Sequence, residues 1–414
     1  LDSNTTGNHN NALGYLALST NTTGTQNTAI GGTALYANTT ASNNTAVGYT
    51  ALYANTTGTR GAALGNLALN SNTTGNNNVA VGSQSLQANT TASDNTAVGY
   101  ASLNVNTTGS VNTAVGKYSL LSNTTGQENT AVGEQCLSAN TTGSGNCGLG
   151  RQALNNNTTA SNNTGMGLYA LYANTTGVSN TAVGKSALLA NTTGENNVAH
   201  GAGSGKAVTT GSYNTLIGDQ AGHYSTALTT GSQNTVVGGL SRTSTVSATS
   251  QIVLGYAVPS VGDYAFSFGN GSGNRVYNFF NSNASWTRSS DERLKKEIQD
   301  NSNCGLGFIN DLRTVTYKWK APSEIAEGVT GHDANVTTAS HTDKMYGFIA
   351  QEVKEAMDAH GITNFNGWDE TPEDQGAIQG ISYEMFVMPL VKAIQELSTQ
   401  NAALAARLTT LEEG

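Results

Sequence analysis

The chain has 414 residues and is acidic, with 27 Asp and Glu against 18 Lys and Arg, a net charge of -9 and an isoelectric point near 5.1. Because no basic run interrupts this acidic background, nucleic acid is not an expected ligand. Forty-nine glycines with only 11% charged residues are unusual for a globular enzyme but typical of stacked repeats with tight turns. No apolar run approaches the roughly 20 residues of a membrane helix, so we expect no membrane insertion.

Charge divides the chain unevenly. Of the 45 charged residues (18 + 27), 14 precede Arg288 and 31 lie from Arg288 onward, and all four prolines follow residue 258. We therefore predict a repetitive shaft over residues 1–205, a β-rich neck over 206–288 and a separate domain over 289–414. Residue 1 falls in mid-repeat, so we expect the chain to be the C-terminal part of a longer protein.

The shaft consists of a 17-residue repeat in which Asn-Thr-Thr recurs from residue 4 to residue 193 without a slip in phase. Such strict phase predicts structural units that stack on each other. Seventeen residues are too few for two helices, but they fit two short strands with two turns, the glycines taking backbone angles that other residues resist. The fold class we predict is therefore mainly β, a parallel β-roll or β-solenoid.

Residues 106–122 form one full repeat. We expect Val115 to point inward from a strand that also holds Thr113, with Leu120 as the second apolar core residue. Burial of this thin core hardly offsets the conformational entropy lost when 17 residues become ordered. We therefore expect several chains to pack together.

The Asn-Thr-Thr triplets match the N-glycosylation pattern, but we interpret them structurally. Asn favours tight turns, and stacked Asn and Thr side chains can form hydrogen-bonded ladders. Cys136 and Cys147 replace Ala and Thr of the repeat, which predicts small buried side chains, and with Cys304 they make no disulfide framework. The histidines show no metal-ligand spacing, so we expect neither metal nor cofactor.

Repeats of the form Asn-Thr-Ala-Val-Gly, as at residues 112–116, resemble the head repeats of trimeric autotransporter adhesins, which form a left-handed parallel β-roll. The resemblance covers about residues 1–205. From about residue 198 the phase loosens and larger apolar residues appear, as at 214–218, 251–255 and 264–268, which predicts the β-rich neck.

The C-terminal segment opens with a pattern typical of a helix start. Ser289 can cap the helix, acidic residues follow, and Glu292 stands three residues after Ser289. Residues 312–320 predict an amphipathic strand, residues 346–353 a strand that enters a helix, and residues 381–384 lead into a long final helix.

That final helix, over about residues 385–413, carries apolar residues at alternating spacings of three and four. This spacing predicts a coiled coil between copies, in which a polar Asn fixes register, although packing on its own domain is an alternative. Lys392, Glu396, Arg407 and Glu412 lie off the seam, where we expect solvated flanks. The predicted seam comprises Val387, Leu390, Ile394, Leu397, Asn401, Leu404, Leu408 and Leu411.

From Ser290 to the end, this order of motifs resembles the self-cleaving intramolecular chaperone at the C-termini of phage tail spikes and fibres, including endosialidases. The resemblance implies trimerisation, assembly of the fibre upstream and autoproteolytic release of the chaperone. It also implies Ser290 as nucleophile, Lys295 as base, Asp291 as the acid after the nucleophile, and cleavage between Ser289 and Ser290.

This chemistry is physically reasonable. A serine hydroxyl needs a proton acceptor, and a lysine can accept the proton if burial lowers its pKa. Five residues apart, Ser290 and Lys295 would lie about 140° apart on one helix. We therefore expect Ser290 on an extended entry and Lys295 in the first helical turns, with the lysine buried only when the trimer forms.

We thus predict a homotrimeric virion tail fibre, or the fibre of an extracellular contractile injection particle, attached upstream to virion or baseplate proteins. Its shaft would bind a glycan or protein receptor on a bacterial surface, and its chaperone would act in the host cytoplasm during assembly. Self-cleavage is the only enzymatic activity we expect. The alternatives are a bacterial cell-surface trimeric adhesin with the same chaperone and, more remotely, an ice-binding protein that uses its threonine rows.

Overall fold

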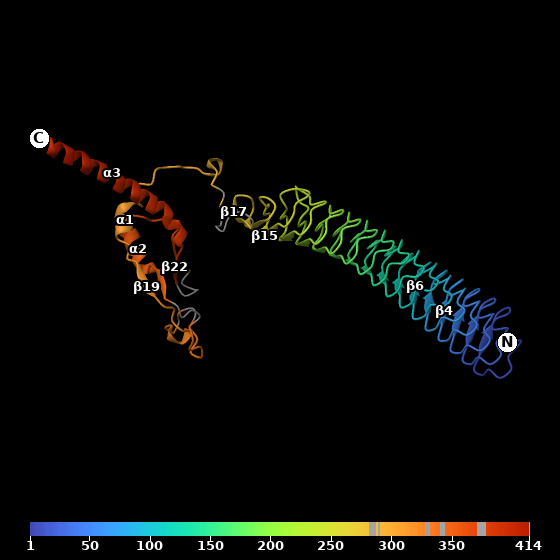
Figure 1. Cartoon of the computed structure of the whole chain (residues 1–414). Coiled ribbons are helices and arrows are strands. Elements are labelled where there is room, and N and C mark those ends of the chain that lie inside the picture. The colour runs from blue at the N-terminus through green and yellow to red at the C-terminus, as the bar shows by residue number, and fades with distance from the viewer. Residues whose placement is uncertain are drawn as a thin grey trace. The chain divides into compact units, whose positions relative to one another are not determined.

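The computed structural model describes residues 1–280, 287–288, 290–327, 329, 332–339, 344–370 and 378–413. The chain divides into two compact units, Leu1–Leu294 and Lys295–Gly414, which are described separately. The first unit is a solenoid of stacked coils (Figure 1), so the predicted mainly β, repetitive solenoid is confirmed.

Each coil of the solenoid contributes a strand to one long sheet whose neighbouring strands run parallel. Thr96 pairs with Thr113, and Thr113 pairs with Thr130, so the repeat itself sets the register. The last strands, β17 and β18, join antiparallel. The strands are β1 Asn11–Leu13, β2 Thr28–Ile30, β3 Thr45–Val47, β4 Ala62–Leu64, β5 Val79–Val81, β6 Thr96–Val98, β7 Thr113–Val115, β8 Thr130–Val132, β9 Cys147–Leu149, β10 Thr164–Met166, β11 Thr181–Val183, β12 Val198–His200, β13 Thr215–Ile217, β14 Thr235–Val237, β15 Ile252–Tyr256, β16 Ala265–Asn270, β17 Asn274–Phe279 and β18 Thr287–Arg288.

The expected direction of Val115 is wrong, and so is the expectation of two strands per repeat. Residues two apart in a strand share a face, so Thr113 and Val115 both face outward while Ala114 between them is fully buried. The remainder of this coil is turn, in which Tyr118 and Leu120 adopt left-handed backbone angles of φ 60° and 47°.

Leucines and alanines fill the thin core. Leu120 is fully buried, as predicted, although a left-handed conformation costs a non-glycine residue roughly 1–2 kcal/mol. Burial of a leucine side chain contributes roughly 1.5–3 kcal/mol, which offsets that strain. Gly116, with φ 131°, must be glycine, because a Cβ there would stand 2.6 Å from the carbonyl oxygen of Gly133 in the next coil.

Asparagine ladders run through the buried side of the coils, which confirms the structural interpretation of the Asn-Thr-Thr triplets. The Asn123 Nδ2 donates to Asn106 Oδ1 at 2.8 Å, and Asn106 Nδ2 donates to Asn89 Oδ1 at 3.1 Å. Asn106 Nδ2 also donates to the carbonyl oxygen of Gly109 at 2.8 Å. These asparagines are fully buried, so their amides join coils and are not displayed to solvent.

The second unit combines short helices and one long C-terminal helix with two small antiparallel sheets, β19 with β20 and β21 with β22, as the α+β prediction for this region requires. Its core is a cluster around Phe308, Val353, Met357 and Phe386. The elements are α1 Leu306–Asn310, β19 Val315–Tyr317, η2 Pro322–Glu324, β20 Met345–Gly347, α2 Ala350–Ala359, β21 Trp368–Glu370, β22 Gln379–Ile381, η4 Tyr383–Phe386 and α3 Val387–Glu412.

Candidate functional site

The segment that holds the predicted catalytic residues is short and exposed. Ser290 precedes η1 (Glu292–Leu294), a single 3-10 turn in which no residue is buried. The helix expected to run through Lys295 is absent: Lys295 and Lys296 have no regular secondary structure. Asp291, directly before this turn, accepts a capping hydrogen bond from the backbone N–H of Arg293. Ser289, on the other side of the predicted cut, lies outside the described residues.

Asp291 is the predicted site residue with the clearest electrostatic environment. Its carboxylate accepts hydrogen bonds from Arg293 Nη2 at 2.6 Å and Nε at 2.9 Å, and from the Arg293 backbone N–H at 2.9 Å. The guanidinium and then the backbone N–H hold the pKa of the Asp291 carboxyl below its usual range. Asp291 is therefore an anion that orders the turn following Ser290.

Lys295 begins the second compact unit and its side chain is exposed, whereas Ser290 belongs to the first unit. The buried environment that a lysine base requires is thus not supplied by the described residues of a single chain.

A polar network that the sequence analysis missed joins α1 to α3. The backbone N–H of Leu306, in the first turn of α1, donates to Glu396 Oε2 at 2.8 Å across 90 residues of sequence. Gly305, the N-cap, has no side chain for this role, and a Cβ there would stand 2.5 Å from the same Glu396 oxygen. Glu396 therefore takes the part of a capping side chain from another helix.

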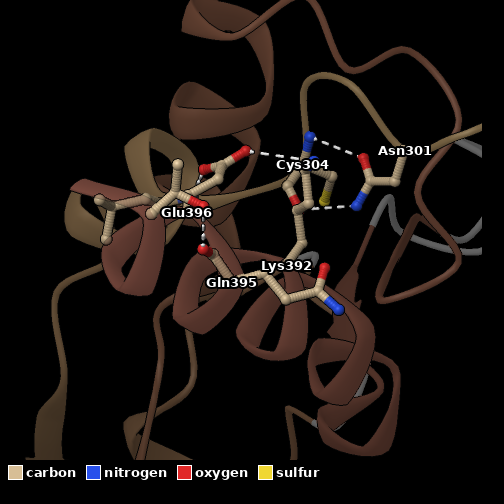
Figure 2. A network of polar contacts seen from close by, with 7 residues as sticks. Asn301, Cys304, Lys392, Gln395 and Glu396 are labelled. Carbon is tan, nitrogen blue, oxygen red and sulfur yellow. Dashed lines mark hydrogen bonds and ion pairs between the residues drawn. The ribbon is translucent and has the colours of Figure 1, made fainter. Parts of the chain in front are cut away.

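Figure 2 shows how this network is assembled. Lys392 lies one helical turn before Glu396 and pairs with it at 3.6 Å. On the preceding loop, Asn301 Nδ2 donates to the Cys304 carbonyl at 2.9 Å, and Asn301 Oδ1 accepts from the Cys304 N–H at 3.0 Å. The expectation that Lys392 and Glu396 are solvated flanks is therefore wrong: both are half-buried on the face of α3 that meets α1. Sequence spacing alone could not reveal a partner so distant along the chain.

The predicted seam of α3 lies on exposed surface. Pro389 and Ala393 are the buried residues of this helix, whereas Ile394 is 66% exposed and Leu411 79% exposed. All seven apolar seam residues have exposed side chains, so the helix does not bury its seam on its own unit. They are Val387, Leu390, Ile394, Leu397, Leu404, Leu408 and Leu411, and the polar Asn401 is exposed with them.

Over the described parts of the chain, no group of three potential His, Cys, Asp or Glu ligands could hold a metal ion. In the same residues, no helix combines the length and apolarity needed to cross a bilayer. The described residues offer three separate features: an exposed serine segment in the first unit, and a capped helix pair and an apolar helix face in the second.

Residues 290–362 match the family model described as chaperone of endosialidase. No curated protein and no solved structure matches the chain. The matched segment starts at Ser290, directly after the strands of the solenoid sheet, and confirms the resemblance drawn from the sequence motifs. A solenoid followed by this domain fits a tail fibre that carries an endosialidase-type chaperone, and the family implies trimeric assembly.

Proposed function

We propose that this chain is a homotrimeric receptor-binding fibre of a phage tail or contractile injection particle, assembled by the chaperone that follows Ser289. The observation that carries the proposal is the chaperone family match that begins where the solenoid sheet ends. A chaperone joined directly to a repetitive shaft has an evident task, because such a shaft must bring several copies into one register.

The outer face of the solenoid sheet supports contact between copies. Central strand residues such as Ala114 point inward, and the residues on either side point outward. Strands β1 to β14 contain no Asp, Glu, Lys or Arg, yet Leu64 is 50% exposed and Leu149 45% exposed. Shaft charges such as Glu134 and Arg151 instead lie in the turns. A long, uncharged and half-exposed apolar row is typical of a surface that is covered on assembly.

The seam of α3 also supports contact between copies, at the C-terminal end of the chain. Burial of Leu404 and Leu408, both more than half exposed in the single chain, requires partner helices, and a heptad seam matches partners of its own kind. Sedimentation equilibrium of the full chain is expected to give three copies. Leu404→Asp should yield a smaller species, whereas Arg407→Asp, off the seam, should remain trimeric; a folded monomer of the unaltered chain would refute the proposal.

Autoproteolysis is the second part of the proposal. Ser290 would attack the carbonyl carbon of residue 289, Lys295 would accept the serine proton, and the leaving amine of residue 290 would take a proton as the ester forms. Water would then hydrolyse this ester and release residues 1–289. Because Lys295 is exposed in the single chain, its activation would await burial by neighbouring copies.

Denaturing gels test this step. Ser290→Ala and Lys295→Ala are expected to leave only full-length chain, whereas the adjacent Lys296→Ala should cut like the unaltered protein. Mass spectrometry of any fragment should place its new terminus at residue 290. A cut that persists in both Ser290→Ala and Lys295→Ala would exclude the dyad, even if the trimer forms.

A further inference from the structure

A small recess interrupts the otherwise repetitive surface of the shaft between β11 and β14. It has a volume of about 210 Å³ and is lined by residues of three successive coils, among them Lys185, Lys206, Asp219 and His223. This volume is below the roughly 300–1,000 Å³ of sites for drug-sized ligands, so it fits one charged group or a single sugar ring.

The recess exists because one coil lacks side chains that its neighbours carry. Ala202 stands in the row that holds Lys185 and Asp219, and Gly203 stands in the row that holds Ser186 and Gln220. A Cβ added at Gly203 would meet one neighbour within 4 Å, the Gln220 side chain at 3.3 Å, so only this flexible side chain closes on the glycine.

Local packing compensates for these small residues. Gly205 takes the place at which earlier coils bury a leucine, such as Leu188, and a Cβ at Gly205 would stand 2.6 Å from Leu216 Cδ1. Leu216 occupies the strand position that is Ala199 in the preceding coil, and it is fully buried. The strand residue Leu216 thus fills the core space that the missing turn leucine would otherwise occupy.

An insertion forms the far wall. Thr215 pairs with Thr235 across a 20-residue offset, which is three more than the repeat, and the additional residues loop out beside His223. The backbone stays ordered there: the N–H of His223 donates to the Gln220 carbonyl at 3.0 Å, and that of Leu228 to the Gly222 carbonyl at 2.9 Å.

Two lysines line this recess. Residues 1–287 contain four arginines and three lysines, and two of these lysines, Lys185 and Lys206, lie in the lining while Lys117 does not. Both are exposed, and in the described part of the chain neither enters an ion pair. The one carboxylate in the lining, Asp219, instead accepts a hydrogen bond from Gln220 Nε2 at 3.2 Å.

His223 adds polar groups but no charge at neutral pH. Its Nδ1 is buried without a hydrogen-bond partner in the described structure, and burial together with the charge of Lys206 lowers the pKa of the ring. The recess is the size of one sugar. Its two ammonium groups match the carboxylate or phosphate of an acidic saccharide, and its amide and hydroxyl groups match the sugar hydroxyls.

We infer that the Lys185–Lys206 recess is a binding site for an acidic sugar unit of a bacterial surface polysaccharide. This inference rests on the receptor-binding function proposed above and gives that function a location and a ligand chemistry. Carboxylated and phosphorylated sugars both carry the required negative charge, and the test below distinguishes them.

The test uses the full chain and calorimetry with defined probes. The carboxylated probe is a hyaluronan tetrasaccharide, with neutral chitotetraose as its match; the phosphorylated probe is glucose 6-phosphate, with glucose as its match. Either acidic probe is expected to bind at least about tenfold more tightly than its neutral match, as a charge-assisted hydrogen bond requires, and to weaken with added salt. Equal binding of acid and neutral probes would overturn the inference, and so would equally tight binding of inorganic phosphate alone.

Variants locate the site. Lys185→Ala with Lys206→Ala should lower the affinity about tenfold or more, and Ala202→Tyr should fill the recess with a residue that Tyr100 shows to be tolerated in this row. Lys117→Ala removes the third shaft lysine, which lies in the same row as Lys185 outside the recess, and should leave binding unchanged. The bound probe should also protect Lys185 and Lys206, but not Lys117, from acetylation read by mass spectrometry. Unchanged binding by both the double variant and Ala202→Tyr would refute the recess as the site.

Attachment of the fibre to a panel of bacteria separates this inference from the function on which it rests. If the double variant and the unaltered chain attach equally well, the recess is not the receptor-binding site, but the fibre still binds a receptor. A fibre that binds the acidic sugar at Lys185 and Lys206 but attaches to no cell would support the recess and contradict the proposed function.

Discussion

The shaft and the C-terminal unit are stabilised in opposite ways. In the shaft, successive coils repeat similar buried leucine, alanine and asparagine contacts, so the loss of one side chain removes one of many equivalent contacts. In the C-terminal unit, a single aromatic cluster serves all the elements around it. Repetition therefore makes the shaft tolerant of change, whereas the chaperone region depends on a few irreplaceable residues.

The largest effect is expected at Phe386. Its ring lies 5.0 Å from that of Phe365, 5.2 Å from that of Phe348 and 6.3 Å from that of Phe308. Phe386→Ala should destabilise the C-terminal unit by about 3–5 kcal/mol, a large share of the stability of a small unit. Thermal unfolding followed by circular dichroism should lose its helical transition while the shaft transition persists. Met388→Ala, at a side chain 64% exposed, is the control; equal sensitivity of the two sites would refute the comparison.

A smaller, local effect is expected inside the asparagine ladder. Asn106→Asp removes the Nδ2 donor and leaves Asn89 Oδ1 and the Gly109 carbonyl facing a buried carboxylate, which should cost about 2–4 kcal/mol at pH 7. Burial raises the pKa of the introduced carboxyl, so its folded form takes up a proton before its unfolded form does as pH falls, and the deficit should shrink toward pH 4.

Asn43→Asp is the matched control for the ladder. Asn43 is exposed, and Asp94 already occupies the same position of another coil. Urea titration should show almost no change for this control at any pH. A deficit at Asn106 that grows on acidification would contradict the account of the ladder.

Much of the shaft could be predicted from the sequence because its information is periodic. Seventeen-residue phase gave parallel strands in register, the buried Leu120 and the asparagine ladders. The prediction for Val115 is wrong because residues two apart in a strand share a face, so Val115 faces outward with Thr113. Beside a buried turn leucine such as Leu120 the small Ala114 fills the strand centre, whereas Leu216 fills it where Gly205 replaces that leucine.

The C-terminal unit was predicted only as far as local patterns reach. The strand-to-helix step into α2 and the apolar seam of α3 follow from short-range periodicity, and the structure contains both. The Glu396 cap on α1 could not be found this way, because its two partners are 90 residues apart. The helix expected through Lys295 is absent: Asp291 caps a single 3-10 turn, and Lys295 lies beyond its end.

A third prediction tests how independent neighbouring coils are. Gly148 stands where most coils have alanine at the centre of the strand, and a Cβ there would lie 2.3 Å from the Sγ of Cys136, which itself replaces alanine. Gly148→Ala alone should therefore cost about 1–3 kcal/mol through overpacking. Gly148→Ala with Cys136→Ala restores the usual pair and should recover most of that loss, giving a coupling energy of about 1 kcal/mol or more. Additive effects would mean that the two positions do not compensate each other.

The Cys136 thiol also reports on opening of its coil. Burial raises its pKa to about 12, so at pH 8 the thiol is protonated as well as enclosed, and should react slowly with iodoacetamide. Gly148→Ala should raise the labelling rate of Cys136, whereas labelling of Cys147, on the outward side of its strand, should change little. A raised rate at both cysteines would indicate that the opening extends beyond the contact between Cys136 and residue 148.

The smallest effect concerns strain that repetition tolerates. Val111 has φ 61° and is 55% exposed, so a β-branched residue sits in a left-handed conformation without burial to offset the strain. Asn43 occupies the corresponding position of another coil at φ 63°, and asparagine adopts this conformation more readily. Val111→Asn should therefore stabilise the shaft by about 1 kcal/mol in urea unfolding, and the reverse change Asn43→Val should destabilise it by a similar amount. The two variants exchange the same residues at equivalent sites, so their changes in the free energy of unfolding should have opposite signs. Changes of the same sign would show that the backbone angle is not the cause.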